Sequence, residues 1–121
     1  MSRALHGLSR SRRLRTPAEF KATLKSAWRG RDEFFGVYAI PNPYPYGRLG
    51  LVVSRKASPR AVVRNRVKRQ VREAFRRYQQ KLGGLDIVVV ASAKAGPASA
   101  TVLQASLQQL WDKVKEQCRR S

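Results

Sequence analysis

Cysteine and histidine are almost absent from this sequence, which has one of each in 121 residues. A lone cysteine, Cys118, forms neither a disulfide framework nor a thiolate metal cluster, and this scarcity is typical of a reducing compartment such as the cytoplasm. His6 is isolated in a basic N-terminal stretch, which argues against a Ser-His-Asp triad or a histidine-based metal site. We therefore expect a cytoplasmic protein with no catalytic residue and no metal ligand of its own.

Acidic residues are also scarce, with seven Asp or Glu against 26 Lys or Arg. None of the seven makes a convincing pair for general acid–base catalysis, because Asp32 and Glu33, which are adjacent, would point to opposite faces of a strand. Long apolar runs are missing too, and the longest, such as residues 87–91, are far too short to cross a bilayer. The basic N-terminus has no apolar segment after it, which argues against a secretory signal.

Positive charge is what the sequence has in excess, with a formal net charge of +19 and an isoelectric point near 11.6. A domain this basic repels itself and adheres non-specifically unless an anionic partner binds it. The length fits one small domain, and a hydrophobic content of 42% allows a modest core. We expect a basic arm over residues 1–15, either awaiting a polyanion or simply frayed, and a single RNA-binding domain over residues 16–121.

Apolar periodicity divides the domain into helices and strands. Thr16, Pro17 and Glu19 predict the start of a helix that Gly30 would end, and Gly83 and Gly84 end a later one. The patterns predict helices over residues 17–28, 61–81 and from about residue 99 or 101 onward, and strands over residues 34–40, 49–54 and 86–91.

This element order, α-β-β-α-β-α, indicates an α+β fold, a two-layer sandwich of helices on a small mixed sheet. We expect the strands at 34–40 and 49–54 to form a hairpin across a loop with three prolines, at residues 41–47. The strands at 49–54 and 86–91 flank the helix at 61–81 and should be parallel. The general rule would make that β-α-β crossover right-handed.

The helix at 61–81 has two opposed stripes, one apolar and one cationic. A merely solvated stripe is the alternative, but such stripes usually mix both signs, whereas residues 55–77 hold ten Lys or Arg and a single acid. Most of these cations are arginines, whose planar guanidinium grips phosphate with two hydrogen bonds. Nucleic acid is the expected partner. The apolar stripe is Val63, Val67, Val71, Ala74, Phe75, Tyr78 and Leu82, and the cationic one is Asn65, Lys68, Arg69, Arg72 and Arg76.

Aromatic residues outside that helix have two interpretations each. Phe20 and Trp28 fit a core better than a base-stacking surface. Tyr44 and Tyr46 could stack on RNA, although packing across their loop is the simpler role. The final helix has an apolar stripe that includes Cys118, which we therefore interpret as a packing residue.

Residues 64–73, Arg-Asn-Arg-Val-Lys-Arg-Gln-Val-Arg-Glu, resemble the signature of the protein subunit of bacterial ribonuclease P. The similarity extends over most of the chain. Residues 14–20 resemble the family's entry into its first helix, residues 50–56 the strand before the signature, and residues 86–90 the strand after it. The match is specific, because a ten-residue motif stands between two matching strands.

This resemblance implies a function. Ribonuclease P removes the 5′ leader of precursor tRNA, its RNA subunit performs the chemistry with Mg²⁺, and its protein subunit binds that RNA and the leader. No cofactor bound by the protein, no membrane and no further protein partner are implied. The alternative is another basic RNA-binding protein of similar fold, such as a ribosomal protein. The family also implies a left-handed crossover and a fourth strand near residues 28–31.

The resemblance also assigns residues to the two RNAs. Phe20 and Tyr38 match aromatics that line the family's leader-binding cleft. The chain departs from the family at Leu24, where another aromatic is common, and over residues 57–60, where the family's loop is shorter and contains glycine. The residues expected to contact the catalytic RNA are Lys56, Arg64, Asn65, Arg66, Lys68, Arg69, Arg72 and Arg76.

Overall fold

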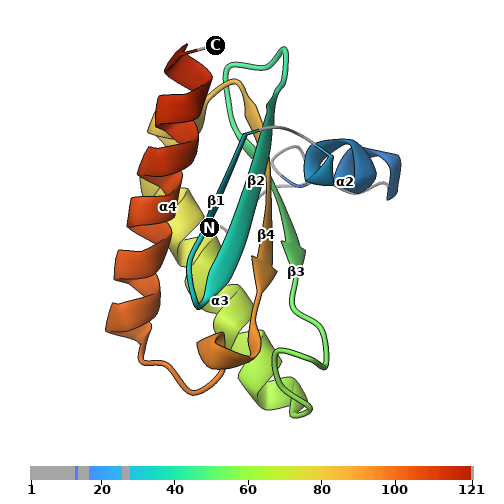
Figure 1. The fold of residues 1–121 in the computed structure, drawn as a ribbon, viewed down its shortest axis with the longest axis vertical. Coiled ribbons are helices and arrows are strands. Elements are labelled where there is room, and N and C mark those ends of the chain that lie inside the picture. Colours follow the sequence, from blue (N-terminus) through green and yellow to red (C-terminus); the bar gives the residue numbers. More distant parts are fainter. Residues whose placement is uncertain (1–12, 14–16, 26–27, 121) are drawn as a thin grey trace, which may run out of the picture.

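The computed structural model describes residue 13 and residues 17–25 and 28–120 of the chain. One helix precedes three consecutive strands and two helices flank the fourth, and the helices cover both faces of one four-stranded sheet to different extents (Figure 1). The prediction of an α+β sandwich with a small mixed sheet is confirmed. In chain order the elements are α2 (Pro17–Leu24), β1 (Trp28–Arg31), β2 (Phe35–Pro41), β3 (Arg48–Val52), α3 (Ala61–Tyr78), β4 (Leu85–Ala91) and α4 (Ala100–Arg120).

Strand β4 occupies the interior of the sheet, whose order is β1-β2-β4-β3. It is antiparallel to β2 and parallel to β3, so the predicted parallel pairing is confirmed. The predicted hairpin between β2 and β3 is wrong, because β4 lies between them. The physical reason is its apolar run: residues 85–89 are all buried, which only a central strand covered on both sides achieves.

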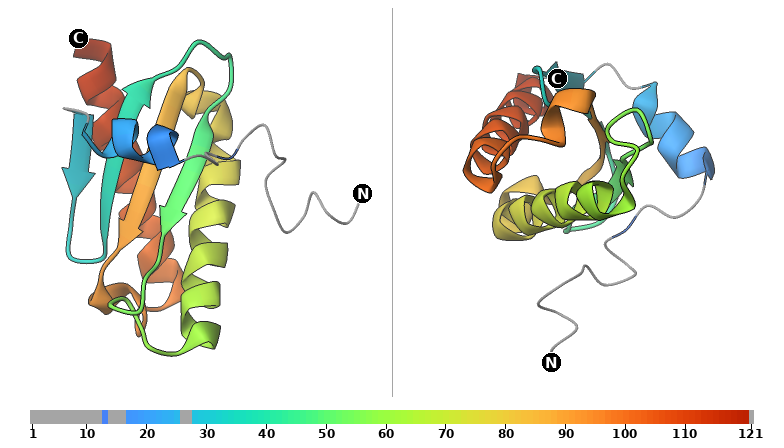
Figure 2. Two further views of the ribbon diagram at one scale, coloured as in Figure 1. Left: turned by 90° about the vertical axis from the view of Figure 1, so that its right-hand side faces the viewer. Right: turned by 90° about the horizontal axis from the view of Figure 1, so that it is seen from below.

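The crossover from β3 through α3 to β4 is left-handed, as the family resemblance implied and against the general rule. In the left panel of Figure 2, α3 and α4 lie behind the sheet and both parallel strands point downward. The chain passes from β3 at the right, up through α3, to β4 on the left of β3.

The first helix is shorter than predicted, because it ends at Leu24 and Trp28 already belongs to β1. Gly30, predicted to stop the helix, lies in the middle of this strand, where a Cβ would stand 3.3 Å from the Leu110 side chain. Pairing with β2 and close packing against α4 thus override the helical pattern. The fourth strand implied by the family is confirmed.

Helix α3 and the outer edge of the sheet each show a detail that the sequence pattern did not predict. Helix α3 ends at Tyr78 and continues as a 3-10 turn over residues 79–82, three residues short of the predicted end. On β1, Gln117 of α4 caps the outer edge: its amide oxygen accepts from the Arg29 N–H at 2.9 Å, and its amide nitrogen donates to the Arg29 carbonyl.

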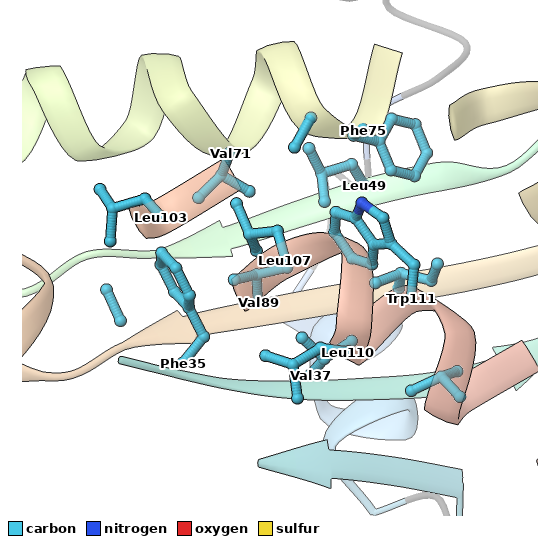
Figure 3. Close-up of a cluster of buried hydrophobic side chains, with 14 of the residues drawn as sticks. Phe35, Val37, Leu49, Val71, Phe75, Val89, Leu103, Leu107, Leu110 and Trp111 are labelled. Atoms are coloured by element: carbon cyan, nitrogen blue, oxygen red, sulfur yellow. The ribbon is translucent and has the colours of Figure 1, made fainter. Parts of the chain in front are cut away.

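The core lies between the sheet and the paired helices α3 and α4 (Figure 3). Phe75 of α3 meets Trp111 of α4 edge to face, with ring centroids 6.1 Å apart. The predicted apolar stripe is confirmed: Val67, Val71, Ala74, Phe75 and Leu82 are buried, and Val63 and Tyr78 are half-buried. Cys118 is half-buried against the core, as a packing residue should be. The strands contribute Phe35, Val37, Leu49 and Val89, and α4 adds Leu103, Leu107 and Leu110.

The opposite face of the sheet is only partly covered, since the short helix α2 lies across only part of it, over β2 and β4 (Figure 2). We call it the open face. Along each strand, the residues of the open face alternate with core residues, and strand pairing aligns them in levels that run across the sheet. One level joins Arg29, Tyr38, Val88 and Gly50, and the next joins Arg31, Gly36, Val90 and Val52.

Candidate nucleic-acid-binding surface

The cationic residues of α3 fall into three groups according to what their side chains contact. Asn65 and Arg69 are exposed to solvent. Lys68 and Arg72 are half-buried and face the edge of the sheet at β3. Arg64, Arg66 and Arg76 contact other groups of the protein, and Arg77 is exposed like Arg69. This division comes from the packing of α3 on the core, which turns Val67 and Val71 inward and leaves the intervening side chains outside.

A hollow of about 210 Å³ lies between α2, α3 and the β3 edge. Phe20 supplies an aromatic wall, Gly50 leaves the floor bare, and three cations, Arg13, Lys68 and Arg72, surround it. Burial, followed by repulsion from Arg13, lowers the pKa of Arg72. Among the described residues that line the hollow there is no carboxylate, so an incoming anion would relieve this repulsion.

A second hollow, of about 400 Å³, runs along the outer side of α3. It is lined by Val62, Asn65, Arg66, Arg69 and Arg72, so Arg72 borders both hollows. Val62 is 65% exposed, which leaves an apolar spot among the cations. A ribose-phosphate chain, which has both charged and apolar parts, is complementary to such a surface.

Three of the predicted contact residues are engaged within the protein. Arg66 donates to the carbonyl oxygens of Gly96 and, at 3.1 Å, Ala98, which fastens the segment before α4 to α3. Arg64 donates to the Ser58 carbonyl at 2.9 Å. Arg76 forms an ion pair with Glu73, at 2.7 Å.

Lys56 stands apart from the helix, in the connection between β3 and α3. It is exposed, and its backbone N–H donates to the Ser54 hydroxyl at 3.2 Å. RNA contact by Lys56, as by the α3 residues, stays a prediction.

Tyr38 lies on the open face, where the ring covers Gly36; a Cβ there would stand 3.3 Å from the ring edge. An open hollow of about 470 Å³ surrounds this part of the sheet and extends to Lys94. Phe20 borders the hollow whose floor is Gly50, at the same level of the sheet as Tyr38. The two predicted cleft aromatics therefore share one face, with β4 between them, and they line different hollows.

The polar network that joins α2 to β3 and β4 was not predicted from the sequence. Arg48 pairs with Asp86 and Glu19, and Asn42 donates to Asp86. Its signal was weak, because these residues are far apart in the chain and meet only once the sheet order is known. Arg29 and Arg31, exposed on β1, were missed for the same reason.

The tyrosines of the proline-rich loop stack on each other, with centroids 5.2 Å apart and planes inclined by 16°. Packing across the loop, the simpler of the two roles considered, is what the structure contains. Arg48 also lies over the Tyr44 ring, 5.0 Å from its centroid.

The described residues offer neither a cluster of metal ligands nor a helix suited to crossing a membrane. They include no group of three or more His, Cys, Asp or Glu able to hold a metal ion. Across the same ranges, every helix falls short of the length and apolar character that a bilayer span requires.

The fold and its surface define a class: small basic α+β domains with a left-handed β-α-β unit, a cationic helix and an open sheet face. Within that class, the chain belongs to the ribonuclease P protein family, a family of tRNA processing, whose model, described as Ribonuclease P, matches residues 8–115.

Similar proteins agree with this assignment. A relative from Methylococcus capsulatus, described as ribonuclease P protein component, is 42% identical over 93% of this chain and 88% of its own length. The solved RNase P protein of Staphylococcus aureus is 30% identical, with a TM-score of 0.77 over 84% of this chain and 93% of its own. That of Thermotoga maritima is 34% identical, with a TM-score of 0.71 over 80% and 92%.

Proposed function

We propose that this chain is the protein subunit of ribonuclease P and assists RNA-catalysed removal of the 5′ leader from precursor tRNA. It binds the catalytic RNA through α3 and the single-stranded leader through the open face. The RNA subunit performs the hydrolysis, with Mg²⁺ held by RNA. Family membership supports this proposal most directly, and the placement of the cations and aromatics supports the division of roles.

The outer surface of α3 suits a structured RNA. Asn65 and Arg69 project into solvent, with Lys68 and Arg72 beside them at the sheet edge. A rigid helix fixes the backbone spacing of these donors, so no backbone ordering is needed when they meet phosphates. Lys56, Arg64 and Arg76 extend the same surface, while Arg66 supports it by holding the segment before α4.

The open face suits a single strand. Cationic grooves with aromatic platforms bind single-stranded nucleic acid with little sequence preference, and each base–aromatic stack contributes about 1–3 kcal/mol. Here Arg13, Phe20, Lys68 and Arg72 border one hollow at the β3 edge of the sheet, and Tyr38 lines another hollow on the open face.

Among the structural observations, the one that carries the proposal is the hollow at the β3 edge, where three cations and an aromatic converge and none of the described lining residues is a carboxylate. Its test is reconstitution: the purified protein is mixed with the catalytic RNA of ribonuclease P and a precursor tRNA at low Mg²⁺. We expect faster 5′ cleavage and tighter binding of precursor than of mature tRNA. No rise in cleavage would refute the proposal, and cleavage by protein alone would indicate a stand-alone nuclease.

A further inference from the structure

Helix α2 carries Phe20 but has little to hold it in place. It is only eight residues long, well below the length at which helices are stable alone. Of its described side chains, Thr23 alone is fully buried, and Leu24 is 39% exposed. Its position over the sheet must therefore depend on specific contacts.

The strongest such contact is polar. The Arg48 guanidinium donates to both carboxylate oxygens of Asp86, at 2.8 and 2.7 Å, and its remaining arm donates to Glu19 at 3.0 Å. Asp86 is 5% exposed and receives a further hydrogen bond from Asn42 at 2.8 Å. The ring of Tyr44 lies against the guanidinium. Arg48 is thus fixed to the sheet on one side and reaches α2 with the other.

Glu19 immediately precedes Phe20, so this ion pair sets where the aromatic wall stands. The hydrogen bond to Asp86 raises the pKa of Arg48, which keeps the guanidinium charged under all ordinary conditions. The Glu19–Arg48 contact is also the more accessible half of the network, with side-chain exposures of 31% and 16% against 7% for Asp86. It can therefore be altered without opening the core.

We propose that Arg48 is a positioning residue for substrate selection: it holds α2 through Glu19 and so places Phe20 against the leader. This inference rests on the proposed function. It assigns Arg48 no contact with either RNA. Breaking the pair should weaken leader recognition while leaving assembly with the catalytic RNA intact.

The experiment measures the affinity of the reconstituted holoenzyme for precursor tRNA and for mature tRNA under conditions that block cleavage. We expect Glu19→Gln to weaken precursor binding about three- to fivefold, the range of a partly exposed ion pair, with mature tRNA unaffected. Arg48→Lys keeps the charge but loses the planar guanidinium that binds both carboxylates, and it should also weaken precursor binding.

A charge-matched control separates position from electrostatics. Glu116→Gln removes one acid from α4, where Glu116 pairs with Arg119 at 3.4 Å. Both Gln variants make the protein more positive, which by itself would strengthen RNA binding. A loss of precursor affinity in Glu19→Gln alone therefore has the opposite sign from a general charge effect.

A double-mutant cycle tests whether Glu19 acts through Phe20. In a Phe20→Leu background, Glu19→Gln should cause no further loss, because there is no aromatic wall left to position. Hydrogen exchange of α2 amides should accelerate in Glu19→Gln, with the amides of β2 and β4 unchanged.

The outcomes are distinct. Equal losses for precursor and mature tRNA, equal behaviour of the two Gln variants, or additive effects with Phe20→Leu would each overturn the positioning role while the proposed function stands. If the wild-type holoenzyme itself fails to prefer precursor over mature tRNA, the leader-binding part of the proposed function falls, and this inference with it.

Discussion

Arg66 and Arg69 stand one helical turn apart on α3, yet the structure predicts opposite consequences for their loss. Arg69 is exposed, and no hydrogen bond or ion pair engages its side chain within the described residues. Arg66 is half-buried and donates to two carbonyls, those of Gly96 and Ala98. We expect Arg69→Ala to reduce RNA affinity with little effect on stability, and Arg66→Ala to do the reverse.

The magnitudes follow from these contacts. A hydrogen bond from a charged donor contributes about 1.5–3 kcal/mol, and since Arg66 is only half-buried, we assign about 2 kcal/mol to both of its bonds together. For a domain of this size that corresponds to a fall in Tm of about 8 °C. Surface substitutions such as Arg69→Ala stay within about 0.5 kcal/mol, or roughly 2 °C.

Two assays separate the variants. Thermal unfolding reports stability, and the salt dependence of binding to the catalytic RNA reports phosphate contacts. In a plot of the logarithm of the binding constant against the logarithm of salt concentration, each lost contact should flatten the slope by roughly 0.7–0.9. This change is expected for Arg69→Ala only. The matched variant Arg66→Lys should recover part of the stability. A wild-type Tm for Arg66→Ala, or a slope that it flattens as much as Arg69→Ala does, would contradict these opposite roles.

Three further predictions concern stability. Val67→Asp places an unpaired charge at a position that is 1% exposed, so circular dichroism should detect an unfolded domain; a folded variant would show that the stripe is not core. Gly47→Ala puts a Cβ 2.7 Å from the Leu82 carbonyl oxygen and should cost about 1–3 kcal/mol in denaturant unfolding, more than Gly36→Ala, whose close neighbours are side-chain atoms. The hydrogen bond to Asp112 raises the pKa of Tyr78 above 10.0, so its stabilisation is complete below that pH and is lost as pH rises through the folded-state pKa. Tyr78→Phe should remove this alkaline loss, and an unchanged pH profile would refute the assignment.

Local patterns were sufficient for elements whose packing agrees with their periodicity. The apolar stripe of α3 and the apolar run of β4 can each be buried in only one arrangement, so both could be predicted from the sequence. Trp28 and Gly30 failed because their segment can continue a helix or pair as a strand, and only contact with β2 and Leu110 decides. The predicted hairpin of β2 and β3 was wrong because the most deeply buried strand, β4, takes the central position between them.

The candidate site follows the same division. Periodicity placed Lys68, Arg69 and Arg72 on one surface of a helix, and the structure keeps them outside the core. Periodicity could not reveal that Arg66 turns toward the carbonyls before α4, because that segment is distant in the chain. The alignment of Phe20 and Tyr38 on one face came from the family resemblance and needed the sheet register to be described.

The cap that Gln117 forms on Arg29 has a consequence for how partners can attach. Unpaired strand edges invite pairing with other chains, and here the side-chain amide takes up the N–H and carbonyl that a neighbouring strand would use. At the other border of the sheet, Arg13 bridges to Leu49. With one backbone position on each border already engaged, pairing of a neighbouring strand at these two positions is discouraged.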